Sequence, residues 1–146
     1  MPAAVVVSER RLSDTRSLIR VLRVGFPMWY RRLPYLFYRT IVARVDGEVV
    51  GFVSMPMRAG VGEIGLIAVA EAARGSGVGA TLLSAALRCM ERSGMHTCVA
   101  KVRVDNPGGQ ALFSRLGFET VGVDSRMWLG DVDRVRRPLS KSGRSA

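Results

Sequence analysis

The sequence predicts a mixed α/β (α+β) fold, and two observations support this prediction. Short apolar stretches that alternate as strands do are separated by stretches with helical spacing, in the order strand, helix, three strands, helix, strand, helix and two strands. One strand-helix-strand crossover interrupts the hairpins, which gives a mixed sheet with helices packed against it. The order of elements contains about seven strands.

Composition indicates one domain and a soluble chain. The chain has 146 residues, of which 48% are hydrophobic, enough for one core. We expect a single domain over residues 1–132 and a basic, disordered tail over residues 133–146. There is no apolar run of membrane-spanning length and no signal-peptide pattern, so we expect a cytoplasmic protein without a membrane partner. Its oligomeric state stays open.

The N-terminal half begins with a strand over residues 3–8 and an amphipathic helix over residues 14–24, capped by Ser13. An aromatic-rich loop with one helical turn follows over residues 25–34. Two strands, residues 37–45 and 49–57, then form a hairpin, because Asp46 and Gly47 supply the positive φ angles of a tight turn.

In the C-terminal half, "EIGLIAV" (residues 63–69) is expected to be one strand. A helix starts at Gly79 and ends before Gly94, and "HTCVAKVRV" (residues 96–104) forms a strand. Asn106 caps the last helix, which Gly117 follows. A final hairpin, residues 118–123 and 126–131, is expected to turn at Asp124 and Ser125.

Charge is large and unevenly placed. The net charge is +10, and residues 10–44 contain nine arginines against one acid, Asp14. This excess favours an anionic partner, whether an acceptor, a nucleic acid or a ribosome surface. For Arg16, Arg20 and Arg23, which have helical spacing, a solvated helix face is the simpler interpretation.

Cysteine and histidine usage excludes several kinds of site. The two cysteines, Cys89 and Cys98, fit neither a disulfide framework nor a zinc site, and we expect both to be reduced core residues. His96 is the only histidine, and no nucleophile elbow accompanies it. No metal is therefore expected.

Three glycines, Gly75, Gly77 and Gly79, lie in "RGSGVG" between the strand and the next helix. A glycine-rich turn at a helix N-terminus presents unpaired N–H groups and suits a phosphate. A Walker loop would need a lysine after Gly79, where the chain has Ala80 and Thr81. A dinucleotide fingerprint is formally present, but the strand ends too far before Gly75, and the chain is too short for a second nucleotide-binding half.

A third interpretation comes from a resemblance. "RGSGVG" (residues 74–79) resembles the Gln/Arg-x-x-Gly-x-Gly pyrophosphate loop of the GNAT superfamily of acyl-CoA-dependent N-acetyltransferases. "NPGGQALFSRLGFE" (residues 106–119) is similar to that family's second signature, and the order of elements agrees over residues 4–131. The resemblance implies a GNAT-like mixed, mostly antiparallel, twisted sheet with helices on both faces. It also implies acetyl-CoA as co-substrate.

The resemblance further implies site residues. The pyrophosphate would be held by Arg74 and the N–H groups of Gly75, Ser76, Gly77, Val78, Gly79 and Ala80. The pantetheine arm would pair with Ile67, Ala68 and Val69, and the Val69 N–H would polarise the thioester carbonyl. Asn106 and Phe113 would lie beside the cofactor.

The sequence departs from the family at its proton-transfer groups. Phe113 stands where many members have a tyrosine that protonates the leaving sulfur, and Lys101 stands where the ribosomal-protein alanine acetyltransferases have a glutamate. Glu63 is then the candidate base, with Tyr30, Tyr35 or Tyr38 as a replacement acid. Loss of the acid should cost about 10² in rate, because a thiol can leave as a thiolate.

The acceptor stays open between a protein N-terminus and a small amine. "FPMWYRRLPYLFY" resembles the acceptor loop of the N-terminal protein acetyltransferases, which makes Trp29, Tyr30, Arg31 and Lys101 candidate acceptor-binding residues. The closing hairpin is too short to carry those enzymes' tyrosine-bearing loop, which keeps small amines in play. A different class is also open, a catalytically weak CoA-binding or nucleic-acid-associated or ribosome-associated module on the same fold.

Overall fold

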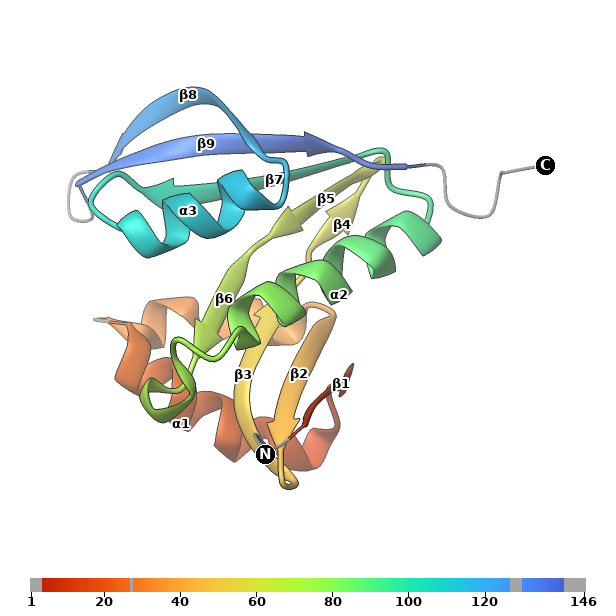
Figure 1. Ribbon diagram of the computed structural model, residues 1–146, viewed down its shortest axis with the longest axis vertical. Helices are drawn as coiled ribbons and strands as arrows, with labels where there is room; N and C mark the ends of the chain where they lie inside the picture. The colour runs from red at the N-terminus through yellow and green to blue at the C-terminus, as the bar shows by residue number, and fades with distance from the viewer. Residues whose placement is uncertain (1–3, 27, 127–129, 141–146) are drawn as a thin grey trace. The chain divides into compact units, whose positions relative to one another are not determined.

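Two β-sheets organise the chain in a computed structural model that describes residues 4–26, 28–126 and 130–140 (Figure 1). One sheet has the strand order β1-β2-β3-β6 and the other β4-β5-β7-β9-β8. The chain divides accordingly into unit 1, residues Met1–Pro56 and Gly65–Ala86, and unit 2, residues Met57–Ile64 and Leu87–Ala146. The predicted mixed α/β class is confirmed. The described residues form nine strands where about seven were predicted.

Unit 1 contains the N-terminal elements and the start of the long helix. Its strands are β1 (Val5–Glu9), β2 (Thr40–Val45), β3 (Glu48–Ser54) and β6 (Leu66–Val69), all paired antiparallel. Its helices are α1 (Thr15–Gly25), the 3-10 helices η1 (Leu12–Asp14), η2 (Trp29–Phe37) and η3 (Glu71–Ala73), and the first part of α2 (Val78–Arg92). The predicted hairpin turn is confirmed, with φ of 50° at Asp46 and 81° at Gly47.

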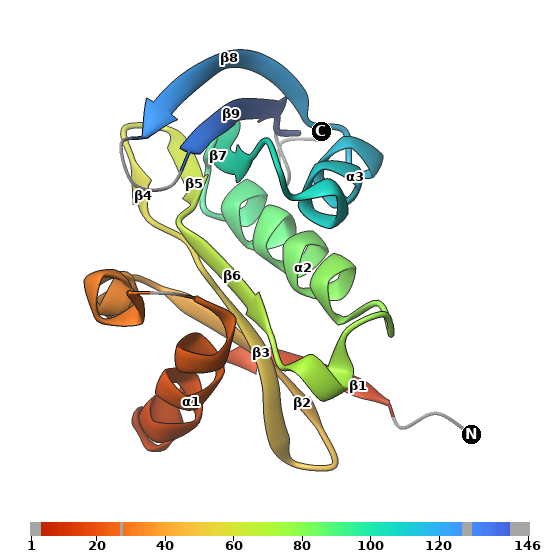
Figure 2. The same cartoon turned by 90° about the vertical axis from the view of Figure 1, so that its left-hand side faces the viewer.

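The two faces of the unit 1 sheet carry different helices. Phe52 of β3 is fully buried in a cluster with Leu18 and Leu22 of α1. The neighbouring residue, Gly51, faces Val78 and Leu82 of α2 instead, because successive strand residues point to opposite faces. Figure 2 shows α1 and α2 on the two sides of β3 and β6.

Unit 2 contains β4 (Met57–Arg58), β5 (Val61–Ile64), β7 (Thr97–Arg103), β8 (Glu119–Arg126), β9 (Gly130–Pro138), the end of α2 and the helix α3 (Pro107–Arg115). Strand β5 pairs parallel with β7, and the other pairs are antiparallel. Among the described residues, no helix is both long and apolar enough to cross a membrane.

Three predictions about element boundaries are wrong. Residues 63–69 form two strands, because the chain changes sheets at Gly65, where a Cβ would lie 2.6 Å from the Tyr35 ring. Asp124 and Ser125 do not turn: both lie in β8, with Asp124 opposite Val132. Residues 133–138 are the paired end of β9, so the predicted disordered tail is wrong there, and residues 141–146 lie outside the described residues.

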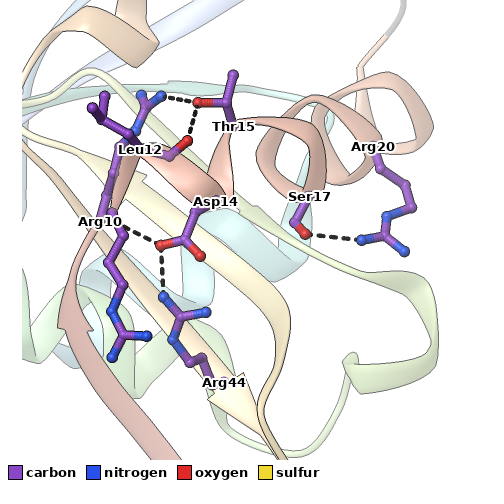
Figure 3. A network of polar contacts seen from close by, with 8 residues as sticks. Arg10, Leu12, Asp14, Thr15, Ser17, Arg20 and Arg44 are labelled. Atoms are coloured by element: carbon purple, nitrogen blue, oxygen red, sulfur yellow. Dashed lines mark hydrogen bonds and ion pairs between the residues drawn. The ribbon is translucent and has the colours of Figure 1, made fainter.

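The predicted Ser13 cap is also wrong, because Ser13 lies within η1 and Asp14 precedes α1. The buried Asp14 carboxylate accepts hydrogen bonds from the Arg11 N–H (2.8 Å) and from Arg44 Nη2 of β2 (2.6 Å) (Figure 3). The hydrogen bond from Arg44 lowers the pKa of Asp14 from its usual value of 3.8. The carboxylate therefore joins α1 to the sheet instead of capping the helix.

Replacement of Gly51 should loosen unit 1. A Cβ at this position would lie 2.9 Å from the Ala68 carbonyl oxygen and 3.0 Å from a Leu82 methyl group. We expect Gly51→Ala to lower the free energy of unfolding by about 1–3 kcal/mol. The matched control is Gly108→Ala, where the nearest atom is 3.8 Å away, and the added helix propensity should leave stability equal or higher. Equal denaturant midpoints for the two variants would contradict this packing.

Removal of the Asp14 charge should change stability and its pH dependence. Because the folded pKa is lowered, the ionised carboxylate stabilises the fold above the unfolded value of 3.8, and this stabilisation is lost as pH falls through the folded value. We expect Asp14→Asn to cost about 2–3 kcal/mol at pH 7 and to flatten the decline of stability below about pH 4.

The control for this variant is Glu9→Gln, which breaks the exposed pair of Glu9 with Arg39. Its cost should stay under about 1 kcal/mol, since solvent screens such pairs. Urea unfolding at several pH values measures both variants. If the free energy of unfolding of Asp14→Asn fell with decreasing pH in parallel with that of the wild type, the ionisation of Asp14 would not contribute to the acid dependence of stability.

Candidate functional site

Strand β6 is one of the two edge strands of the unit 1 sheet, and its backbone is paired on one side. It lies antiparallel to β3 with Ala68 opposite Phe52, and the Ala70 N–H donates to the Val50 carbonyl (2.7 Å). Because hydrogen bonding alternates along an antiparallel strand, Ala68 points its N–H and C=O toward β3. Ile67 and Val69 point theirs to the opposite edge.

This alternation corrects part of the predicted cofactor contact. Ile67, Ala68 and Val69 were all expected to pair with an added strand, but the backbone of Ala68 is already engaged by β3. The Ala68 side chain is buried in the cluster beneath α1. Ile67 and Val69 remain available for an extended ligand.

Arg74 lies against this free edge. Its Nε donates to the Val69 carbonyl over 3.2 Å, which agrees with a carbonyl that points away from β3. The Arg74 side chain is otherwise exposed, with Nη2 about 4.0 Å from where a Cβ of Gly25 would lie. One side chain thus connects the start of the glycine loop to the edge of β6.

The glycine loop, residues 74–80, presents its backbone outward. Gly75 and Gly77 have φ of 78° and 85°, and a Cβ built on either would have no atom within 4 Å. Within the described part of the chain, the N–H groups of residues 75 to 80 donate to no protein acceptor, whereas the Thr81 N–H donates to Gly77 O over 3.0 Å. The Ser76 hydroxyl donates to the Ala73 carbonyl and shapes the turn.

These features suit a diphosphate. Open space around two left-handed glycines lets an anion approach the backbone, and Val78, Gly79 and Ala80 form the unpaired first turn of α2 at the positive end of its dipole. Arg74 adds a full positive charge at the loop entrance. The residues present therefore fit the pyrophosphate of a nucleotide-like cofactor.

Helix η2 carries the predicted acceptor residues of unit 1. It is a nine-residue 3-10 helix where the sequence suggested one turn. Trp29 packs against the core beneath α1, and the Arg23 guanidinium lies 5.3 Å from its ring centroid. Tyr30 meets the Trp29 ring edge-on at 6.2 Å and is 55% exposed, and Arg31 is exposed.

Unit 2 carries Glu63 and Lys101 on one face of its sheet. Glu63 of β5 is half-buried and lies opposite Val99 of β7, two residues before Lys101. Gly62 faces Met90 of α2, so Glu63 points to the other face of the sheet. Lys101 is ion-paired with Asp124 at 3.7 Å, a partner that the sequence did not reveal.

The remaining predicted cofactor residues lie at α3. Asn106 caps this helix as predicted, with its Oδ1 accepting from the Gly109 N–H at 3.0 Å. Phe113 is 5% exposed and packs edge-to-face on Phe118 at 5.0 Å. Phe113 therefore packs in the core of unit 2, and its predicted contact with the cofactor stays a prediction.

The cysteines are core residues, as predicted. Cys89 and Cys98 are free thiols with 3% and 0% exposure. Burial raises the pKa of Cys98 to about 12, so this thiol is protonated at neutral pH and cannot serve as a nucleophile.

Comparison with known proteins identifies the family. The model of the acetyltransferase (GNAT) family matches residues 12–118, which include the glycine loop and α3. The chain belongs to the GNAT acetyltransferase family. The predicted membership of this family is thereby confirmed.

Individual relatives agree with this assignment. An N-alpha-acetyltransferase of Sulfurisphaera tokodaii is 31% identical over 139 residues, which cover 80% of this chain and 81% of that protein. The ribosomal-protein-S18-alanine N-acetyltransferase of Escherichia coli has the same fold, with a TM-score of 0.85 at 19% identity over 98% of this chain and 99% of its own. A Salmonella typhimurium acetyltransferase solved with acetyl-CoA gives a TM-score of 0.79 at 19% identity, over 94% and 95% of the two chains.

Other relatives are much longer. A mycothiol acetyltransferase of Streptomyces avermitilis is 34% identical over 85 residues, which cover 57% of this chain. The chain spans only 28% of the length of that enzyme.

The loop conformation can be tested at Gly77. Gly77→Ala places a methyl group at a φ of 85° in the middle of the loop, and we expect acetyl-CoA binding to weaken at least about 10-fold, which corresponds to about 1.4 kcal/mol. The matched control is Gly47→Ala in the β2–β3 turn, with a φ of 81° and the same open surroundings. Titration calorimetry measures the acetyl-CoA affinity of both variants. An equal loss of affinity in the two would mean that backbone strain in general, and not the conformation of the glycine loop, weakens binding.

Proposed function

We propose that this chain transfers the acetyl group of acetyl-CoA to the N-terminal α-amine of a polypeptide by direct attack of the amine on the thioester. One observation carries the proposal: six unpaired N–H groups, residues 75–80, adjoin an edge strand on which Ile67 and Val69 direct their backbone groups away from β3. A pyrophosphate and an extended amide-bearing arm are the two parts of CoA that need these two kinds of backbone surface.

Backbone groups have the larger role in binding. The loop N–H groups and Arg74 hold the pyrophosphate, and the edge of β6 pairs with the amides of the pantetheine arm. The Val69 N–H donates to the carbonyl oxygen of the thioester and stabilises the charge that develops there. Acetyl-CoA supplies the activated acetyl group.

Side chains are needed mainly to accept the proton of the attacking amine and to donate a proton to the leaving sulfur. A neutral amine forms a bond to the thioester carbon, the carbon–sulfur bond breaks, and one proton leaves the nitrogen. We propose Glu63, directly or through water, as the base that receives this proton. The sulfur leaves as a thiolate or takes a proton from water or from Tyr30, whose exposed phenol is the candidate acid.

The acceptor assignment rests on likeness to the N-alpha-acetyltransferase and on the composition of η2. Trp29 and Tyr30 form an aromatic corner at the start of η2, followed by Arg31. Such a corner suits the apolar first side chain and the backbone of a peptide. The likeness to a mycothiol acetyltransferase keeps a small-molecule amine as the second candidate.

The acceptor can be identified by comparing matched substrates. One peptide has a free α-amine, a second has a blocked α-amine and an internal lysine, and a panel of small amines completes the set. We expect thiol release with the first peptide alone, with mass spectrometry locating the acetyl group on its N-terminus. Turnover of small amines alone would refute the peptide assignment while leaving the acetyl-CoA chemistry intact.

Glu63→Gln tests the proposed base. We expect kcat to fall by about 10²-fold with unchanged acetyl-CoA affinity, because the amide cannot accept a proton. Glu48→Gln, an exposed glutamate at the start of β3, is the matched control and should keep full activity. Unchanged turnover in Glu63→Gln would remove Glu63 from the mechanism.

A further inference from the structure

The outer face of α1 carries three arginines that the acetyl-transfer chemistry does not use. Arg16, Arg20 and Arg23 are all exposed and lie at helical spacing, opposite the buried face of α1. No carboxylate in the described ranges forms an ion pair with them. Arg20 Nη2 donates to the Ser17 hydroxyl over 3.0 Å (Figure 3), and the Arg23 guanidinium lies over Trp29.

The surrounding sequence does not neutralise this face. Residues 15–45, which comprise α1, η2 and β2, contain seven arginines, no lysine and no acid. Neighbouring positive charges on one helix repel each other, so a face of this kind gains stability from a bound anion. The sequence alone favoured a solvated face, whereas the absence of carboxylate partners within the described residues favours a ligand.

The three arginines also surround a hollow. It has a volume of about 370 Å³ and is lined by Arg16, Ile19, Arg20, Arg23 and Val24. Its aliphatic part includes Val24, a side chain that is 65% exposed. A surface that combines guanidinium groups with an open apolar floor suits a ligand with both charged and flat apolar parts.

Two features favour a nucleic acid strand over an acidic peptide. Every cation between residues 15 and 45 is arginine, whose planar fork binds phosphate through two hydrogen bonds. The hollow adjoins the Arg23–Trp29 pair, and Tyr30 beside it exposes 55% of its surface, which provides a ring for stacking a base. Single strands, including the loops and ends of RNA, display unpaired bases that such a ring can stack on.

We propose that the outer face of α1, with Arg16, Arg20 and Arg23, is a binding surface for a single-stranded nucleic acid, for which RNA is the probe. The arginines hold consecutive phosphates, and the apolar floor of the hollow contacts a sugar or base. The three arginines take no part in the proposed cofactor site, whereas Trp29 and Tyr30 beside them belong to the proposed acceptor corner.

The test is fluorescence anisotropy with a labelled, mixed-sequence RNA of about 20 nucleotides, measured over a range of salt concentrations. The variant replaces Arg16, Arg20 and Arg23 by glutamine. We expect affinity to fall at least about 10-fold and the slope of log affinity against log salt to shrink by about 2, since each single-strand phosphate contact contributes about 0.7.

The matched control replaces Arg88, Arg92 and Arg115, three exposed helical arginines of unit 2, by glutamine. It removes the same net charge and should retain affinity within about threefold and an unchanged salt slope. Equal weakening of both variants would overturn the proposal. So would polyglutamate competing as well as unlabelled RNA, whereas a DNA strand of the same sequence should compete because it offers the same phosphates and unpaired bases.

Acetyl-CoA binding provides the independent measurement. The triple variant at α1 should retain wild-type acetyl-CoA affinity by titration calorimetry, which shows that its fold is intact. Loss of RNA binding together with loss of acetyl-CoA binding would indicate misfolding and would overturn the assignment of these arginines. An inactive wild-type enzyme that still binds RNA through α1 would instead remove the proposed function alone.

Discussion

The divided hydrogen bonding of β6 is the constraint on which the site depends. The N–H and C=O groups of Ala68 point toward β3. The same alternation directs the N–H and C=O groups of Ile67 and Val69 to the opposite edge of the strand. Arg74 already uses this edge by donating to Val69 O, which shows that the carbonyl is accessible to a donor. An extended ligand can therefore bind unit 1 without any dedicated side chain.

Gly51 positions the second part of the same site. Because it lacks a side chain, Val78 and Leu82 of α2 approach β3 directly, which brings the first turn of α2 close to β6 within unit 1. The glycine loop then covers only the short distance from η3 to α2, with two residues at positive φ. The packing of the sheet on α2 and the binding of phosphate by the loop thus both depend on the close approach of α2 to β3 at Gly51.

Much of this arrangement could be predicted from the sequence because it depends on local rules. Three features depend only on backbone groups a few residues away. They are the glycines before α2, the cap that Asn106 provides for the Gly109 N–H, and the Asp46-Gly47 turn. The errors arose where distant contacts decide the outcome. Tyr35 lies beside Gly65, where the apolar stretch divides into β5 and β6, and Asp124 forms ion pairs with Lys101 and Arg134 from within β8. The burial of Phe113 against Phe118 likewise depends on packing that no short motif encodes.

The central claim is that backbone N–H groups at two places in unit 1 bind acetyl-CoA, and residue-resolved amide hydrogen exchange tests it most directly. Upon addition of saturating acetyl-CoA, we predict strong new protection at Ile67, Val69 and residues 75 to 80. The amide of Ala68, already bonded to β3, should be protected with and without the ligand. Unchanged exchange in the loop and at Val69, with acetyl-CoA shown to be bound, would contradict the claim.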